Sequence, residues 1–446
     1  MRAASDYTAI AGPECRSGSI YGVAMADAQN AGTGAIGQAA LRWGRRRVLA
    51  RAGGQGERDV ATPGPRGCRG VRKGVILEIT MAKTKMQLLL DEGQSVWLDY
   101  LRRGMTRSGE LGALIDDGLR GMTSNPTIFE AALASTDYDD ALAELSSSPK
   151  TEREIFEALA IEDVREAADR FRRVYDATQG GDGFVSLEVS PGMARDTEGT
   201  VAEARRLWQA VDRPNVMIKI PGTREGWPAI ERCLREGINI NITLLFSIEH
   251  YKEVAEAYLR ALEARLQQGQ PIGRLASVAS FFVSRVDTEV DKRLGSGPGS
   301  QELRGKVAVA GARLAYAMFL DQMQSPRWKK LEAGGARKQR LLWASTGTKN
   351  PAYSDVLYVE SLIGPDTIST VPVETLKLFE DHGVIARTLS SDSGTEARRV
   401  MDALAAAGID FDDVNRTLER EGIEKFVKSY ESLLGVIAQK RRALTR

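Results

Sequence analysis

A lysine lies within a short apolar stretch, Asn215-Val-Met-Ile-Lys-Ile220. The stretch is rich in β-branched residues and is followed by Pro221 and Gly222, which predicts a strand buried on both faces. A buried ammonium group is costly unless it is paired or loses its proton. A neutral lysine is a nucleophile that forms Schiff bases with sugar carbonyls. Lys219 is therefore a candidate nucleophile, unless it lies at the strand's end with its ammonium group in solvent.

Polar side chains also end or follow the other predicted strands. Taken singly, each could be a helix N-cap, a turn residue or an exposed charge, and Asn125-Pro126 alone would be an ordinary turn. Together, an amine with two carboxylates, amides, hydroxyls and cations is what an enzyme of phosphorylated sugars requires. Besides Lys219 the candidates are Asp99, Asn125, Glu188, Asn241, Thr243, Ser280, Arg285, Ser345 and Lys349.

These residues need strands that deliver them to one place. Strands alternate with amphipathic helices from residue 86 onwards, which predicts a parallel sheet, and eight such units close a (β/α)8 TIM barrel with its chemistry at the C-terminal strand ends. The predicted strands are Ser95–Tyr100, Arg120–Ser124, Phe184–Val189, Asn215–Ile220, Ile240–Leu245, Ser277–Phe282, Leu341–Thr346 and Thr367–Val371. The predicted helices between them are Arg107–Leu119, Thr197–Ala210, Gly226–Arg235, Ser247–Gln268, Gln301–Met323 and Tyr353–Ile363.

Three further helices are extra to a minimal barrel. Thr151–Thr178 is an amphipathic insert before the third strand, and Glu396–Ala407 and Val414–Leu444 follow the eighth. The last carries an apolar stripe that includes Phe426 and Tyr430, so we expect it to pack across the barrel or to cap its mouth.

Residues 1–80 differ in composition from residues 81–446, which we assign to the barrel and its C-terminal helices. They are rich in Gly, Ala and Arg without an amphipathic period, and we expect them to be disordered. Met81 would be an ordinary start, so the extension is either a start placed too far upstream or, less in keeping with its acidic residues, a transit peptide. Gly32–Gly37 matches GxGxxG but has no strand before it, so we expect no dinucleotide site.

Composition excludes several classes of function. The net charge of +1 favours neither nucleic acid nor a membrane surface, and no apolar run reaches the roughly 18 residues of a membrane span. Cys15, Cys68 and Cys233 have no metal-site spacing and suit a reduced, cytoplasmic setting. The two histidines, His250 and His382, lie away from strand ends. We therefore expect no metal and no cofactor.

Six segments resemble transaldolase, in order and at barrel-like spacings. The resemblance covers residues 84–444, and the insert and C-terminal helices make the chain similar to a longer bacterial form of that family. The block from Lys219 to Phe246 is the most specific. The matching segments are Ser95–Asp99, Gly121–Thr127, Val185–Val189, Met217–Thr223, Gly237–Ser247 and Ala279–Arg285.

The resemblance implies a class I Schiff-base mechanism. Lys219 would form the imine, Asp99 would take the proton from the C4 hydroxyl, and Glu188 would act as acid and base through a water held partly by Thr243. The remaining positions would bind substrate: Asn125, Asn241 and Ser280 the hydroxyls or the dihydroxyacetone unit, Arg285 the phosphate, and Lys349 with Ser345 a second phosphate contact in place of the arginine of shorter members.

The implied reaction transfers dihydroxyacetone from sedoheptulose 7-phosphate to glyceraldehyde 3-phosphate, giving erythrose 4-phosphate and fructose 6-phosphate. A fructose 6-phosphate aldolase is the alternative enzyme that the resemblance allows. That family has the same lysine on a much shorter chain, so the length of this chain argues against it. A phosphosugar-binding barrel without catalysis would not need Lys219, Asp99 and Glu188 together. Acceptor preference and oligomeric state stay open.

Overall fold

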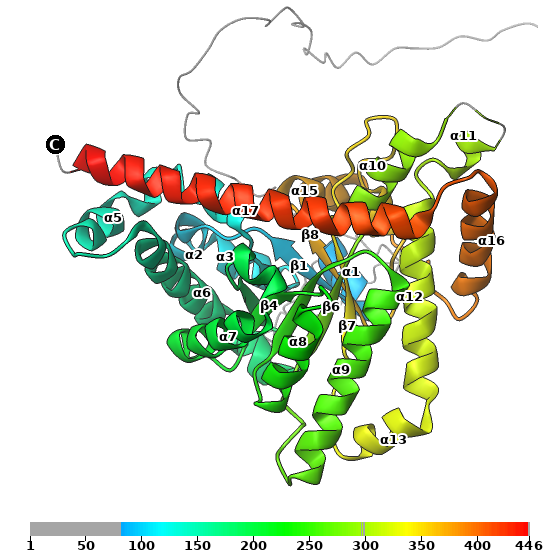
Figure 1. The fold of residues 1–446 in the computed structure, drawn as a ribbon, viewed down its shortest axis with the longest axis horizontal. Coiled ribbons are helices and arrows are strands. Elements are labelled where there is room, and N and C mark those ends of the chain that lie inside the picture. Colours follow the sequence, from blue (N-terminus) through cyan, green and yellow to red (C-terminus); the bar gives the residue numbers. More distant parts are fainter. Residues whose placement is uncertain (1–81, 296, 298, 445–446) are drawn as a thin grey trace, which may run out of the picture. The chain divides into compact units, whose positions relative to one another are not determined.

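The computed structural model describes residues 82–295, 297 and 299–444. Eight parallel strands close into a barrel in chain order, with β8 hydrogen-bonded to β1, which confirms the predicted (β/α)8 TIM barrel (Figure 1). The strands are β1 (Gln94–Asp99), β2 (Leu119–Thr123), β3 (Phe184–Glu188), β4 (Val216–Pro221), β5 (Ile240–Leu245), β6 (Ser277–Phe282), β7 (Arg340–Ala344) and β8 (Thr367–Val371). The expectations for residues 1–80 concern a part of the chain outside the described residues.

The strands form where apolar and β-branched residues predominate. Every residue of β4, β5, β6 and β8 is buried, as expected for parallel strands that are covered by helices outside and by packed side chains within. The register pairs Glu188 with Lys219 and Lys219 with Asn241. Three polar candidates from neighbouring strands therefore lie at one level of the barrel.

Helices surround the barrel, and many begin at side-chain caps. Thr151 forms a capping box at the start of α6, and Ser247 caps α9. The helices are α1 (Lys85–Asp91), α2 (Arg103–Ser108), α3 (Glu110–Asp116), α4 (Pro126–Leu133), η1 (Thr136–Tyr138), α5 (Asp139–Ser146), α6 (Glu152–Ala177), η2 (Pro191–Arg195), α7 (Thr197–Val211), α8 (Gly226–Arg235), α9 (Ile248–Gln267), α10 (Ser284–Arg293), α11 (Ser300–Leu303), α12 (Val307–Gln324), α13 (Pro326–Ala333), α14 (Leu357–Glu360), α15 (Val373–His382), α16 (Ser393–Ala406) and α17 (Phe411–Leu444).

Three predicted helices differ from the structure. The expected helix Arg107–Leu119 is two helices, because Gly109 has a φ of 90° that ends α2, and Leu119 already belongs to β2. The expected helix Gln301–Met323 is likewise divided, into α11 and α12, next to Gly305 with a φ of 70°.

Tyr353–Ile363 was expected to be one helix but contains only the short α14. Local bonds hold the chain before α14 in turns instead. The side chain of Asn350 accepts from the backbone N–H of Ala352 at 3.0 Å, and the hydroxyl of Thr348 donates to the carbonyl of Ser354 at 2.9 Å. Such side-chain bonds compete with helix formation.

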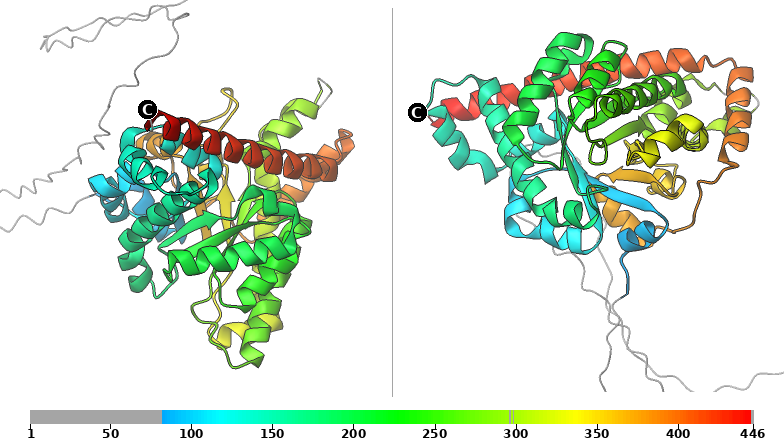
Figure 2. Two further views of the ribbon diagram at one scale, coloured as in Figure 1. Left: turned by 60° about the vertical axis from the view of Figure 1, so that its left-hand side comes forward. Right: turned by 90° about the horizontal axis from the view of Figure 1, so that it is seen from below.

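The longest helix, α17, crosses the C-terminal end of the barrel. It contacts α4, α10, η2 and the end of β5, all of which lie at that end, and it runs across the other elements in both views (Figures 1 and 2). Phe426, Leu433 and Ile437 of the predicted stripe are buried. The expectation that this helix caps the mouth is thus confirmed, as is the insert before β3, which forms α6.

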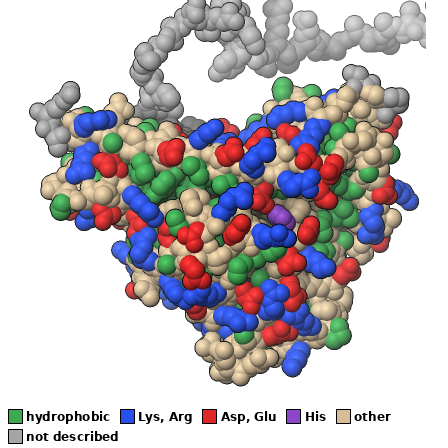
Figure 3. Space-filling model, in the orientation of Figure 1, with side chains coloured by type: hydrophobic (Ala, Val, Ile, Leu, Met, Phe, Trp, Pro, Cys, Tyr) green, Lys and Arg blue, Asp and Glu red, His purple; other side chains and the backbone are tan. Residues whose placement is uncertain are grey.

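The surface carries charges of both signs. Basic and acidic side chains intermingle over the face in Figure 3, and many form pairs, such as Arg327 with Glu263 at 2.6 Å. Such exposed pairs each stabilise a fold by about 1 kcal/mol or less. Within residues 82–295, 297 and 299–444, no helix is long and apolar enough to cross a membrane.

Candidate active site

Lys219 points into the barrel from β4 and is only 4% exposed. Its Nζ lies 3.2 Å from Oε2 of Glu188 and donates a hydrogen bond of 3.2 Å to the carbonyl oxygen of Ser124. The ring of Phe426, from α17, lies over the ammonium at 5.8 Å. The alternative that this lysine reaches solvent at the strand's end is therefore wrong.

Glu188 ends β3 and faces Lys219 across the strand pair. Its side chain is 4% exposed, and neither carboxylate oxygen accepts a well-aligned hydrogen bond from a described residue. Burial raises the pKa of Glu188, and the charge of Lys219 offsets that increase only in part. A buried acid with a raised pKa beside an amine is suited to exchange protons with it.

Asp99 ends β1 and is held at the mouth by hydroxyl groups. Its Oδ1 accepts a hydrogen bond of 2.8 Å from Thr123, whose hydroxyl in turn lies 2.8 Å from that of Thr370. Asp99 is half-buried and lines the central cavity. The hydrogen bond fixes one carboxylate oxygen and leaves the other to face the cavity.

Thr243 and Asn241 lie on the same face of β5. The Thr243 hydroxyl is fully buried and has no hydrogen-bond partner among the described residues, although it lines the cavity. Asn241 is engaged on both sides: its amide donates to Ser186 at 2.9 Å and accepts from Ser280 at 2.7 Å. Asn241 does not line the central cavity, whereas Ser280 does.

Arg285 lies in the first turn of α10, directly after β6. Its guanidinium group lies over the rings of Phe282 at 5.2 Å and Phe426 at 5.8 Å. Burial lowers the pKa of Arg285, while Asp99 and Glu188 raise it in part. No described residue forms a hydrogen bond with this guanidinium. Its five donors are thus available to an anion.

Two more predicted residues lie on the loop after β7. Ser345 has a positive φ of 56°, and its hydroxyl lies 2.9 Å from that of Ser284 at the start of α10. A positive φ is uncommon for a residue with a side chain, and such conformations cluster at functional sites. Lys349 is exposed at the rim of the cavity.

Asn125 is the N-cap of α4, as the alternative structural interpretation of this residue expected. Its Oδ1 accepts a hydrogen bond of 3.0 Å from the backbone N–H of Ile128. The residue also lines the central cavity and a second, smaller one. The cap fixes the side chain without excluding contact with a ligand.

Most of the predicted residues meet at one cavity. It lies at the C-terminal end of the barrel, and its empty space of about 910 Å³ includes solvent at the open mouth. Glu188 adjoins it through its contact with Lys219. The predicted residues that line the cavity are Asp99, Asn125, Lys219, Thr243, Ser280, Arg285, Ser345 and Lys349.

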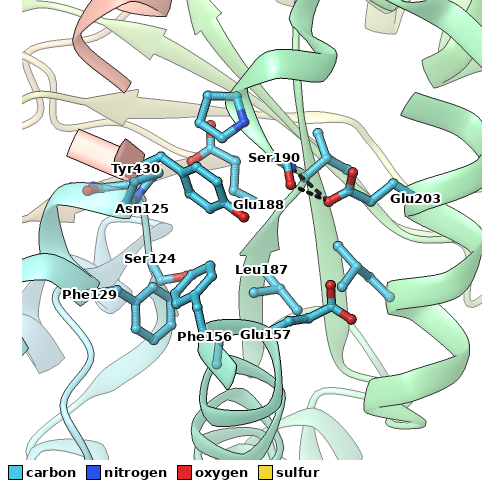
Figure 4. Close-up of a pocket in the computed structure, with 15 residues that line it drawn as sticks. Ser124, Asn125, Phe129, Phe156, Glu157, Leu187, Glu188, Ser190, Glu203 and Tyr430 are labelled. Atoms are coloured by element: carbon cyan, nitrogen blue, oxygen red, sulfur yellow. Dashed lines mark hydrogen bonds between the residues drawn. The ribbon is translucent and has the colours of Figure 1, made fainter. Parts of the chain in front are cut away.

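Glu188 itself lines the neighbouring side cavity, which lies between β3, α4, α6, α7 and α17. Figure 4 shows aromatic rings on one side of it, from Phe129, Phe156 and Tyr430, with Ser190 hydrogen-bonded to Glu203 on the other. The rings of Phe129 and Phe156 meet edge to face at 5.4 Å. This apolar wall keeps the Glu188 carboxyl out of bulk water, which is the cause of its raised pKa.

Sequence reasoning missed two features of the site. Lys425 of α17 lines the cavity, and Thr123 and Thr370 orient Asp99. Phe426 was recognised only as part of an apolar stripe. A lysine directly before a stripe residue of a helix expected to cap the mouth was a weak signal for Lys425. No local pattern pairs Thr123 with Thr370, because they meet only when the barrel closes.

A buried lysine, carboxylates and cations lie together at the C-terminal strand ends of this (β/α)8 barrel. Enzymes with this fold carry their active sites at that end, so the architecture is that of an enzyme. Among the residues that the structure describes, no group of three or more His, Cys, Asp or Glu side chains is arranged to hold a metal ion.

Comparison with known proteins gives the family. Residues 96–437 match the family described as transaldolase/fructose-6-phosphate aldolase, and the chain belongs to this family of enzymes. A transaldolase of Saccharopolyspora erythraea is 52% identical over 358 residues, covering 80% of this chain and 97% of that protein. A transaldolase of Thermobifida fusca is 51% identical over 365 residues, covering 81% of this chain and 99% of that protein. Relatives this similar indicate transaldolase function, a transferase activity.

Proposed function

We propose that this chain transfers a dihydroxyacetone unit from sedoheptulose 7-phosphate to glyceraldehyde 3-phosphate through a Schiff base at Lys219. One observation carries the proposal. The buried Lys219 amine lies 3.2 Å from the buried carboxyl group of Glu188. It faces a cavity that is also lined by cationic side chains. An amine, an acid and anion-binding groups at one mouth suit the carbonyl chemistry of a sugar phosphate.

The first step forms the imine. Glu188 takes a proton from Lys219, directly or through a water, because its raised pKa favours the neutral acid in this buried position. The free amine attacks C2 of the ketose, and Glu188 returns a proton to the departing hydroxyl, which leaves as water. The unpartnered Thr243 hydroxyl supports this assignment, because it can hold that water.

The second step breaks the C3–C4 bond. Asp99 accepts the proton of the C4 hydroxyl, the electron pair of the C3–C4 bond moves towards the imine nitrogen, and erythrose 4-phosphate leaves. The Thr123 hydroxyl supports this role by holding one oxygen of Asp99 at 2.8 Å. The remaining enamine then attacks the aldehyde carbon of glyceraldehyde 3-phosphate, and Asp99 returns its proton to the aldehyde oxygen, which becomes the new C4 hydroxyl. Hydrolysis of the new imine releases fructose 6-phosphate.

Substrate binding follows from the remaining groups. Ser280 and Asn125 face the cavity and would bind hydroxyls, and Asn241 would act by positioning Ser280, to which it is hydrogen-bonded at 2.7 Å. Arg285, Ser345 and Lys349 would hold the phosphate. A cytoplasmic location is part of the proposal, since the free, buried thiol of Cys233 suits a reducing compartment.

Borohydride trapping with fructose 6-phosphate, followed by peptide mass spectrometry, tests the proposal. We expect a dihydroxyacetone-sized adduct on Lys219 and none in Lys219→Ala, which should still bind the phosphosugar while its turnover falls on the order of 10⁴-fold or more. Folded wild-type protein that binds phosphosugar with Lys219 unmodified would instead indicate a binding barrel. Release of free dihydroxyacetone at the rate of transfer would indicate the aldolase alternative.

A further inference from the structure

Three cationic side chains line the central cavity together. Arg285, Lys349 and Lys425 all line it, and we call them the cationic rim. None of the three forms a hydrogen bond or an ion pair with another residue that the structure describes. By contrast, surface arginines elsewhere, such as Arg206 and Arg327, are paired with glutamates. The rim is therefore a positive site whose three side chains form no ion pair with a described residue.

The three charges act on one another. Partial burial lowers the pKa of Lys425, and the charges of Arg285 and Lys349 lower it further. Like charges held together destabilise a site unless a counter-charge is present. The carboxylates in reach of Arg285 are Asp99 and Glu188, which belong to the deeper part of the site. A dianion at the rim would supply the missing charge.

The position of Lys425 is fixed by its neighbours on α17. Phe426 is 4% exposed and covers both Lys219 and Arg285. One turn earlier, a Cβ on Gly422 would lie 3.0 Å from Leu244 Cδ2 and 3.6 Å from Arg285 Nη1. The glycine thus allows α17 to pass close to the end of β5 and to Arg285, which keeps Lys425 at the rim.

We propose that Lys425 is a ligand of the substrate's phosphate, so that the C-terminal helix supplies part of the phosphate site. The proposal rests on the function proposed above and extends it. Arg285 gives the phosphate a planar pair of donors, while Lys349 and Lys425 act as point charges from two other elements. Binding of a phosphorylated sugar then joins the β6–α10 segment, the loop after β7 and α17 through a single anion.

The test compares Lys425→Met with two matched variants. Lys425→Arg keeps the charge, and Lys428→Met removes an exposed lysine of α17 that does not line the cavity. The concentration that half-saturates borohydride trapping is measured with fructose 6-phosphate and with fructose. We expect Lys425→Met to raise it about tenfold for the phosphorylated sugar and to leave it unchanged for fructose. Lys425→Arg should recover most of the loss, and Lys428→Met should match wild type.

Calorimetry with inorganic phosphate on the same variants makes the test independent of the Schiff base. Lys425→Met should weaken phosphate binding about tenfold whether or not Lys219 is trapped. Failure of wild-type trapping would overturn the proposed function alone. Equal phosphate affinity in wild type and Lys425→Met would overturn the role of Lys425 alone. An equal loss with fructose and fructose 6-phosphate would also overturn it, because that would indicate a displaced α17.

Discussion

β3 has a buried carboxylate at each end, and the two carboxylates have opposite surroundings. Asp182, just before the strand, accepts hydrogen bonds from Ser95 and, at 2.8 Å, from the indole of Trp97, and pairs with Arg340 at 3.4 Å. Glu188, at the other end, has no well-aligned donor among the described residues, and its ion-pair partner is Lys219. The hydrogen-bonding capacity of Asp182 is satisfied, as is usual for a structural residue. That of Glu188 is not, which is typical of a residue at a functional site.

The comparison shows how one strand can serve stability and function separately. A buried polar group without partners costs about 1–3 kcal/mol, so an unpartnered acid persists only where something else favours it. At the N-terminal end of the barrel each donor near Asp182 has an acceptor, and replacing the carboxylate should harm folding. At the mouth, the hydrogen-bond donors to Glu188 are expected to come from the substrate and its water, so replacing Glu188 should lower turnover.

Among the substitutions that test this comparison, Glu188→Gln should have the largest effect. The amide keeps the shape and can still accept from Lys219 but cannot transfer a proton, so kcat should fall about 10²–10⁴-fold. The melting temperature should change little. Steady-state rates and thermal unfolding measure both. If the variant kept its activity but lost stability, Glu188 would be a structural partner of Lys219 and the contrast with Asp182 would not hold.

Asp182→Ala should produce the converse result. It removes the acceptor of Ser95 and Trp97 and the ion-pair partner of Arg340, so we expect a loss of about 3 kcal/mol in the free energy of unfolding. Activity per folded molecule should equal that of wild type. Urea unfolding and rates at low temperature separate the two quantities. A catalytic defect without a loss of stability would contradict the assignment.

Thr243→Val sharpens the contrast with a neutral group. The substitution removes a hydroxyl that has no partner among the described residues, so stability should not fall. If that hydroxyl holds the reacting water, kcat should drop about tenfold, which corresponds to one hydrogen bond. Thr123→Val offers a matched comparison, because its hydroxyl acts through Asp99. An unchanged kcat in Thr243→Val would remove this residue from the mechanism.

The smallest effect is a pH dependence of stability. The folded-state pKa of Glu188 is raised above its ordinary value of 4.5, so folding favours the protonated acid. The folded state binds more protons in the window between the two pKa values, and stability is lost as the pH rises from 4.5 through the folded-state pKa. The amide side chain introduced by Glu188→Gln does not titrate. The melting temperature of this variant should therefore increase relative to that of wild type as the pH rises through this window. A difference that is constant with pH would contradict the raised pKa.

The sequence was sufficient for the architecture because barrel strands are encoded locally. Runs such as Val216–Pro221 are mainly apolar and buried throughout, and the predicted strand ends fall within about two residues of the observed ones. Helix divisions were harder to foresee. Gly109 and Gly305 end helices because they adopt left-handed conformations. The sequence alone does not show whether an isolated glycine in a helical pattern will end the helix or continue it.

The candidate site was predictable as far as it follows the strands. Lys219, Glu188 and Asp99 lie at strand ends, and barrel geometry brings strand ends together. Lys425 and the link from Thr123 to Thr370 depend on how distant segments meet, which no local pattern records. The engagement of Asn241 with Ser186 and Ser280 was hidden for the same reason.

The helix that crosses the mouth, α17, follows all eight strands of the barrel in the sequence. A ribosome delivers the strands that carry Lys219, Glu188 and Asp99 before it delivers Phe426 and Lys425, since domains emerge N-terminal end first. A nascent barrel would therefore hold its reactive amine uncovered until α17 has been made. A chain cut short before α17 would keep its nucleophile but lose the cover over it, so the strands supply the chemistry and a later segment supplies the enclosure.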